Sequence, residues 1–137
     1  MKLRFAILLS LAVCVGVGAS TANAGKVAPS ISLNTVSGTA GAAATQPALG
    51  TWLTFNTTIP SNVRIPRVEV LCYQNGALVY GEAGGPTDAF QLGGGGSIWL
   101  YEGGGAANCV ANLYYFGQVN GQSTAIYLAT TSFAAAG

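Results

Sequence analysis

Two Asn-Gly dipeptides, Asn75-Gly76 and Asn120-Gly121, constrain the fold of this chain more than any other feature of its sequence. Each separates two short runs that contain several Val, Leu, Ile, Tyr or Thr residues. Asn-Gly is the strongest short signal for a two-residue β-hairpin, because both central residues must adopt positive φ angles. The stretch EVLCYQNGALVYGE at residues 69–82 is therefore predicted to form one antiparallel hairpin, and residues 108–132 a second.

Similar short runs recur along the chain, separated by Gly, Pro and Asn, and they show no helical period. They lie at residues 30–36, 51–59, 67–74, 77–81, 89–92, 98–101, 108–116 and 124–132. The Ala- and Gly-rich segment 38–44 is interpreted as a loop or a frayed edge. Seven to eight short strands within about a hundred residues predict an all-β fold, an antiparallel β-sandwich.

The N-terminus has the layout of a secretory signal peptide. Two basic residues precede an apolar run, and the segment closes on Ala22-Asn23-Ala24. We expect cleavage after Ala24, which leaves residues 25–137 as one domain and sends it to the extracellular space. The alternatives are a membrane anchor, for which the apolar run is shorter than the required ~20 residues, and lipid attachment at Cys14, where Val13 departs from the usual small residue.

Few charges remain after cleavage, and they sum to −1. Three cationic side chains stand against four acidic ones: Lys26, Arg64 and Arg67 against Glu69, Glu82, Asp88 and Glu102. Nucleic acid binding requires clustered Lys and Arg, so no nucleic acid partner is expected. Docking on anionic lipid is excluded for the same reason, and no segment of the expected mature chain predicts a membrane span.

Cleavage would also leave an even number of cysteines, Cys72 and Cys109. In an oxidising compartment one disulfide is the default, and the loop that it closes is nearly forty residues long. A zinc site is the other interpretation. It is weaker, because the chain has no histidine and no C-x-x-C motif.

Counting outward from the two turns predicts which side chains face each other across the hairpins. The expected pairs are Gln74 with Ala77, Tyr73 with Leu78, Cys72 with Val79 and Leu71 with Tyr80, then Tyr115 with Ile126, Tyr114 with Tyr127 and Leu113 with Leu128. Alternation places one set in the interior: Val68, Val70, Cys72, Val79, Cys109, Ala111, Leu113, Tyr115, Ile126 and Leu128. The candidate binding face, which points outward, comprises Leu71, Tyr73, Leu78, Tyr80, Tyr114, Phe116 and Tyr127.

A cysteine before an Asn-Gly hairpin, a second cysteine opening VANLYYF, and eight short strands together resemble an immunoglobulin-like β-sandwich. The resemblance implies that the two hairpins act as C-C′ and F-G of one sheet. It departs from antibody domains, where the disulfide joins two sheets and packs against a buried Trp; here Trp52 and Trp99 lie in other strands. Over most of residues 25–137 the chain also resembles small uncharacterised bacterial secreted proteins with one disulfide, through C-Y-Q-x-G-x-L-V-Y, L-G-G, S-x-W and C-x-A-x-L-Y-Y-F. That resemblance implies no activity.

The chain has few residues of the types that catalysis usually requires. Without histidine, a serine or cysteine nucleophile lacks its usual base. Glu69 and Glu82 are expected opposite each other, which would suit a glycosidase-like pair or a calcium site. The simpler interpretation is two solvated charges at strand ends. The glycine clusters at 93–96 and 103–105 lack the Lys of a phosphate loop and are interpreted as turns.

Two classes of function follow. The first is a secreted non-catalytic interaction or structural module, whose outer aromatic face binds a partner protein, a polysaccharide or a second copy of the chain. It would need no cofactor and no metal. The alternative is a small secreted carboxylate-dependent hydrolase or calcium-binding protein that uses Glu69, Glu82 or Asp88. The sequence is also compatible with a face covered by the N-terminal segment or by a glycine-rich loop.

Overall fold

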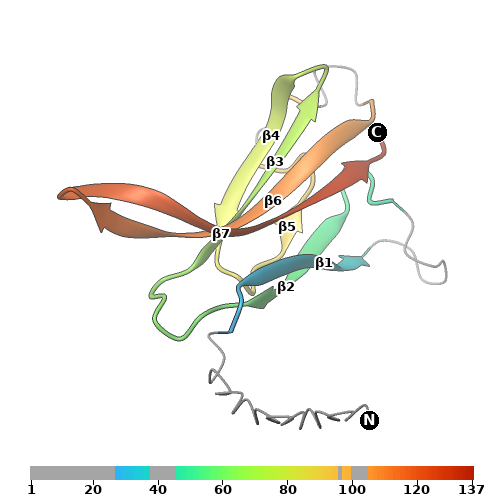
Figure 1. Cartoon of the computed structure of the whole chain (residues 1–137). Coiled ribbons are helices and arrows are strands. Elements are labelled where there is room, and N and C mark those ends of the chain that lie inside the picture. The colour runs from blue at the N-terminus through green and yellow to red at the C-terminus, as the bar shows by residue number, and fades with distance from the viewer. Residues whose placement is uncertain (1–26, 38–45, 96, 100–104) are drawn as a thin grey trace, which may run out of the picture.

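A computed structural model of the chain describes residues 27–37, 46–95, 97–99 and 105–137. These residues contain seven β-strands and no helix. The strands are β1 (Ser30–Ser37), β2 (Trp52–Thr58), β3 (Arg67–Gln74), β4 (Ala77–Gly84), β5 (Phe90–Gln91), β6 (Ala107–Val119) and β7 (Gln122–Ala135), as Figure 1 shows. The predicted signal peptide, Cys14 and the loop at 38–44 lie outside the described residues.

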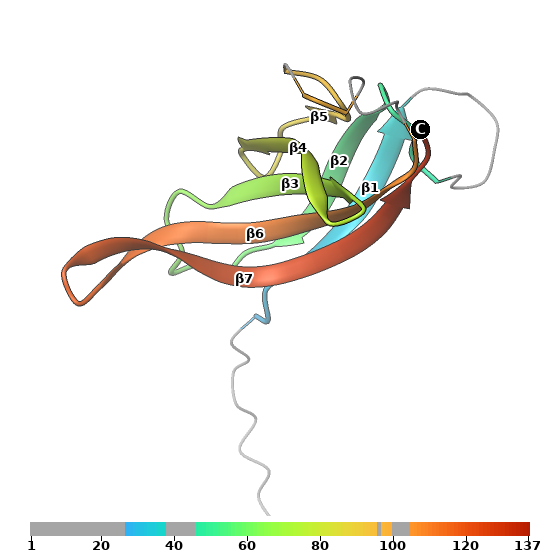
Figure 2. The same cartoon turned by 90° about the horizontal axis from the view of Figure 1, so that it is seen from above.

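The strands form two antiparallel sheets, one of three strands in the order β1-β2-β5 and one of four in the order β4-β3-β6-β7. Figure 1 shows β1 and β2 below the four-stranded sheet, and Figure 2, from above, shows them crossing behind it. The all-β sandwich predicted from the sequence is therefore confirmed, and both Asn-Gly hairpins lie in the same sheet.

Both Asn-Gly turns have the predicted geometry. The φ angles are 50° at Asn75 and 83° at Gly76, and 52° at Asn120 and 78° at Gly121. Positive φ at both central positions matches the right-handed twist of the flanking strands. The predicted pairs on the turn side of each register shift are also confirmed, Tyr73 with Leu78 in the first hairpin and Tyr114 with Tyr127 in the second.

Farther from the first turn, the predicted register is wrong by one residue. Cys72 pairs with Tyr80 instead of Val79, and Leu71 pairs with Gly81. The extra residue is a β-bulge in β4, and from there on the bulge reverses the face on which each β4 side chain lies. Val79 and Tyr80 are consequently both buried.

The second hairpin carries a bulge of the same kind. Leu113 pairs with Ala129 instead of Leu128, so that Leu128 is the extra residue of β7. Leu128 still packs against the core, as predicted. Tyr115 and Ile126, also expected in the interior, are only half-buried and lie outside the core cluster, because the hairpin extends beyond the second sheet at this point.

The core fills the space between the sheets. It is a single cluster of buried side chains: Ile31, Leu53, Phe55, Val68, Val70, Cys72, Val79, Tyr80, Phe90, Leu92, Trp99, Ala107, Cys109, Ala111, Leu113 and Ala135. The ring of Phe55 in β2 meets Phe90 edge-on at 5.8 Å between centroids and lies 6.4 Å from Phe133 in β7. The first contact lies within the three-stranded sheet, and the contact with Phe133 links it to the four-stranded sheet.

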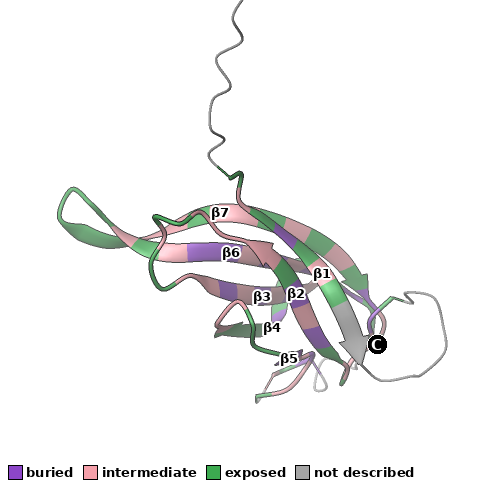
Figure 3. Cartoon of the chain, turned by 90° about the horizontal axis from the view of Figure 1, so that it is seen from below, coloured by how far each residue is buried: buried purple, intermediate pink, exposed green. Residues whose placement is uncertain are grey.

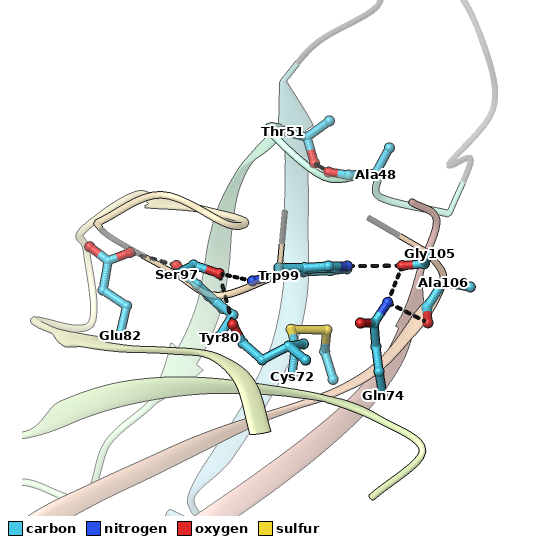
Figure 4. Close-up of a disulfide and its surroundings, with 12 residues drawn as sticks. Ala48, Thr51, Cys72, Gln74, Tyr80, Glu82, Ser97, Trp99, Gly105 and Ala106 are labelled. Carbon is cyan, nitrogen blue, oxygen red and sulfur yellow. Dashed lines mark hydrogen bonds between the residues drawn. A yellow bond between two sulfur atoms is a disulfide. The ribbon is translucent and has the colours of Figure 1, made fainter. Parts of the chain in front are cut away.

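The predicted disulfide between Cys72 and Cys109 is confirmed. The two residues are direct partners on β3 and β6, with Cα atoms 4.0 Å apart, so the bond joins neighbours within one sheet. Trp99 lies beside it in Figure 4 and is completely buried. The expected strand at 98–101 is wrong where it is described, because Ile98 and Trp99 lie in a bend and a turn.

The turn that holds Trp99 is tied to β4 and to the segment that precedes β6. Its indole N–H donates to the carbonyl of Gly105 at 2.8 Å, and its backbone N–H donates to Ser97 Oγ at 3.0 Å. Ser97 Oγ donates in turn to the carbonyl of Val79 in β4 at 2.8 Å. A loop, not a strand, therefore places this indole over the disulfide (Figure 4).

Candidate interaction surface

The predicted binding face lies on the outer side of the four-stranded sheet, but it is not continuous. Leu78, Phe116 and Tyr127 are about half-exposed, Leu71 and Tyr73 are partly buried, and Tyr80 and Tyr114 are buried. The cross-strand register divides the outward side chains into successive rows. Two apolar groups result, with a row of polar side chains between them.

Tyr80 does not belong to this face, which corrects the prediction. The bulge at Val79 turns Tyr80 toward the interior, where it is only 3% exposed and belongs to the core cluster. Its hydroxyl donates to Glu82 Oε2 at 2.5 Å. Burial, together with this hydrogen bond and the negative charge of Glu82, raises the pKa of Tyr80 far above its usual value.

At one end of the sheet lies the aromatic patch, which we define as Tyr114, Phe116 and Tyr127. The ring of Tyr114 meets Phe116 edge-on at 5.6 Å and is tilted against Tyr127 at 5.7 Å. Tyr114 is 6% exposed, whereas Phe116 and Tyr127 are 57% and 56% exposed. Tyr114 thus supports the two exposed rings from below, in arrangements that aromatic pairs prefer.

Arg67 lies directly opposite Tyr114 on β3, at the edge of the aromatic patch. Its side chain is half-buried, and its Nε atom is buried without a hydrogen-bond partner among the described residues. Buried polar atoms of this kind are few in native proteins. A cationic group therefore borders the rings of the aromatic patch.

The polar row consists of Glu69, Asn112 and Thr130, which are partners on β3, β6 and β7. Asn112 Nδ2 donates to Glu69 Oε1 at 3.0 Å, and Thr130 Oγ1 donates to Asn112 Oδ1 at 2.7 Å. A hydrogen bond from the Tyr127 hydroxyl to Glu69, and the negative charge of Glu69, raise the pKa of Tyr127. These hydrogen bonds hold the side chains of the polar row in place along the border of the aromatic patch.

The second apolar group, the leucine patch, consists of Leu71, Tyr73 and Leu78 on β3 and β4. Its leucines pack over Gly81, where an added Cβ would lie 3.3 Å from a Leu71 methyl. Beside Tyr73 is a shallow depression of about 500 Å³, lined on its far side by Ser132, Phe133 and Ala134. This end of the face is therefore hollowed beside Tyr73.

The three carboxylates of the alternative function do not converge. Glu69 pairs with Ala83, while Glu82 pairs with Val70, so the two glutamates lie on opposite faces and the expected opposition is wrong. The bulge in β4 causes this difference. Asp88 instead accepts the backbone N–H of Gly85 at 2.6 Å and closes a turn. Within the described residues, no group of three His, Cys, Asp or Glu side chains is placed to hold a metal ion.

Sequence reasoning found most members of the face but missed its supporting polar row. Nothing in the sequence linked Asn112 or Thr130 to Glu69. Their pairing depends on the bulge at Leu128, which brings Thr130 opposite Asn112.

No protein family, curated protein or solved structure matches this chain. In the described part of the chain, no helix is long and apolar enough to cross a membrane.

Proposed function

We propose that this chain is a secreted, non-catalytic interaction module that binds a macromolecular partner, a protein or a polysaccharide, through the aromatic patch. Secretion is supported by the pattern of residues 1–24 and by the disulfide, since such bonds persist in oxidising compartments. The order β4-β3-β6-β7 is the one expected if the two hairpins correspond to C-C′ and F-G. This order supports kinship with immunoglobulin-like sandwiches.

The observation that carries the proposal is the exposure of Phe116 and Tyr127 above a buried Tyr114. Exposed rings that neighbours already hold in place lose little conformational entropy when they bind, which favours their use as anchors. The adjacent polar row offers hydrogen-bonding groups for the polar atoms of a partner. A shallow, broad surface of this kind suits an extended partner better than a small molecule, which requires a concave pocket.

The test is the double substitution Phe116→Ser with Tyr127→Ser, compared with Ile65→Ser. Ile65 is the matched control because it is 83% exposed and lies in the loop before β3. Binding is measured as retention on insoluble cellulose, chitin and peptidoglycan, and as cross-linking of partner proteins to a photoreactive residue at position 118, which is exposed, lies two residues from Phe116 on β6 and is unchanged in every variant.

We expect the double variant to lose most of the retention or cross-linking, and Ile65→Ser to keep it. Stability should change little in either variant, by about 0.5 kcal/mol for each exposed position. Binding that is undiminished in the double variant would contradict the proposal. The class of probe that retains the wild-type chain separates a polysaccharide partner from a protein partner.

A further inference from the structure

The end of the β6–β7 hairpin extends beyond the rest of its sheet. β3 pairs with β6 only as far as Tyr114, and from Tyr115 to Val119 the partner of β6 is β7 alone. We call residues 115–126 the arm. Figures 1 and 2 both show it projecting past the other strands, and Figure 3 shows that its tip is exposed.

Within the part of the chain that the structure describes, the arm is a two-stranded ribbon without a third strand or a packed layer to support it. Two-stranded ribbons are marginally stable in water unless a third strand or a packed layer supports them. The arm is regular, with continuous register from Val119 with Gln122 to Tyr115 with Ile126. Its residues Phe116 and Val119 are 57% and 46% exposed. A further strand at its edge would supply the missing support.

The other sheet edges are protected against such pairing. β5 has only two residues, and β1 carries a register shift between Leu33 and Thr35. β4 contains Glu82, and its Val79 carbonyl accepts a hydrogen bond from Ser97. Short strands, irregular register, charges and covering loops are the usual means by which edge strands avoid other chains.

The β7 edge of the arm lacks these protections. From Gly103 to Gly137 the sequence contains no charged residue and no proline. The bulge of β7, at Leu128, lies outside the arm. β3 begins at Arg67, opposite Tyr114, so β3 pairs with β6 only up to the base of the arm. Among the described residues, no strand pairs with the outer edge of β7.

We propose that the arm pairs with the arm of a second copy, β7 against β7 in antiparallel orientation, to form an intermolecular four-stranded ribbon. An uncharged edge meets its own copy without repulsion, whereas an edge that carries a charge would repel itself. The net charge of the expected mature chain, −1, adds little repulsion between the two molecules. Because the arm projects past the other strands (Figure 2), two copies would meet there while their sandwiches stay apart.

The symmetry of this pairing has a consequence for the aromatic patch. Two antiparallel copies of one strand in one sheet are related by a twofold axis perpendicular to that sheet, which keeps each face on its own side. The aromatic patches of both copies therefore lie on the same side of the dimer. The pairing uses the strand edge, so it does not depend on the partner that the patch binds.

The test compares Ser123→Lys with Ser61→Lys by sedimentation equilibrium over a wide range of concentration. Both serines are exposed and both variants gain one positive charge, but Ser123 lies in the arm and Ser61 in a loop turn. We expect the wild type and Ser61→Lys to dimerise, and Ser123→Lys to dimerise about tenfold more weakly or worse, since like charges would then face each other across the edge. Equal melting temperatures establish that both variants are folded.

Hydrogen exchange gives a second readout. A two-residue turn closes through its flanking pair, so alternation directs the N–H groups of Ser123 and Ala125 away from β6. These two amides should exchange more slowly at concentrations where the protein is dimeric. A wild type that is monomeric at all concentrations overturns the proposal. A dimer that survives Ser123→Lys but dissociates in the Phe116→Ser, Tyr127→Ser variant also overturns it and assigns self-association to the patch.

Discussion

Trp99 is the residue whose truncation should destabilise this fold most clearly. Its side chain is 0% exposed, lies against the disulfide and donates a hydrogen bond to Gly105. Replacement of a buried tryptophan by alanine typically costs about 3–5 kcal/mol, from lost burial and from the cavity that remains. We expect Trp99→Ala to lower the free energy of unfolding by this amount, measured by urea denaturation followed with far-ultraviolet circular dichroism.

Two further variants isolate the cause of that loss. Trp99→Phe removes the indole N–H but keeps an aromatic ring, and the Gly105 carbonyl still accepts Nε2 of Gln74 at 2.6 Å. This variant should therefore cost only about 1–2 kcal/mol. Trp52 is the second tryptophan and is 48% exposed, so Trp52→Ala should cost about 1 kcal/mol or less. Equal losses for Trp52→Ala and Trp99→Ala would refute the assignment of Trp99 to the core.

The other predictions concern the disulfide, a buried phenol and a close glycine contact. Joint replacement of Cys72 and Cys109 by alanine should lower the free energy of unfolding by about 4 kcal/mol, the value for a closed loop of this length, measured in urea. Burial raises the pKa of Tyr80, so the stability that it contributes is present below the unfolded-state value and is lost as pH rises above about 10. Denaturation across this pH range should show a steeper loss for the wild type than for Tyr80→Phe. Gly93 and Gly95 both have positive φ, but an added Cβ at Gly93 would meet a leucine methyl at 2.2 Å, while at Gly95 it meets nothing within 4 Å. Thermal melting should therefore find Gly93→Ala less stable than Gly95→Ala, and equal losses would contradict this packing.

Local sequence signals predicted those features whose cause is local. Asn75-Gly76 and Asn120-Gly121 predicted two turns, and the runs between turn residues predicted all seven described strands within a few residues of their bounds. The disulfide followed from cysteine number and compartment alone. These predictions required no knowledge of how the two sheets pack.

The bulges could not be predicted in the same way, because they depend on packing between layers. Strict alternation would have kept Tyr80 on the outer face and placed only Val79 inside, whereas the bulge buries both. Trp99 was misplaced for a related reason. A short apolar run predicts a strand. The indole of Trp99 is instead held in the core by a loop, through hydrogen bonds from Trp99 to Gly105 and to Ser97.

The bulges also determine what kind of surface this sheet presents. Without them, the outer face would carry a nearly continuous series of aromatic and leucine side chains, of the size that solvent-exposed surfaces of monomers seldom show. The bulge at Val79 removes Tyr80 from that series, and the bulge at Leu128 brings Thr130 opposite Asn112. The outer face of the four-stranded sheet therefore does not need another segment packed over its whole length, because the polar row interrupts its apolar side chains. The large apolar side chains that stay exposed on this face are confined to two small patches, and those of the aromatic patch lie on the arm or at its base, where we expect the second copy.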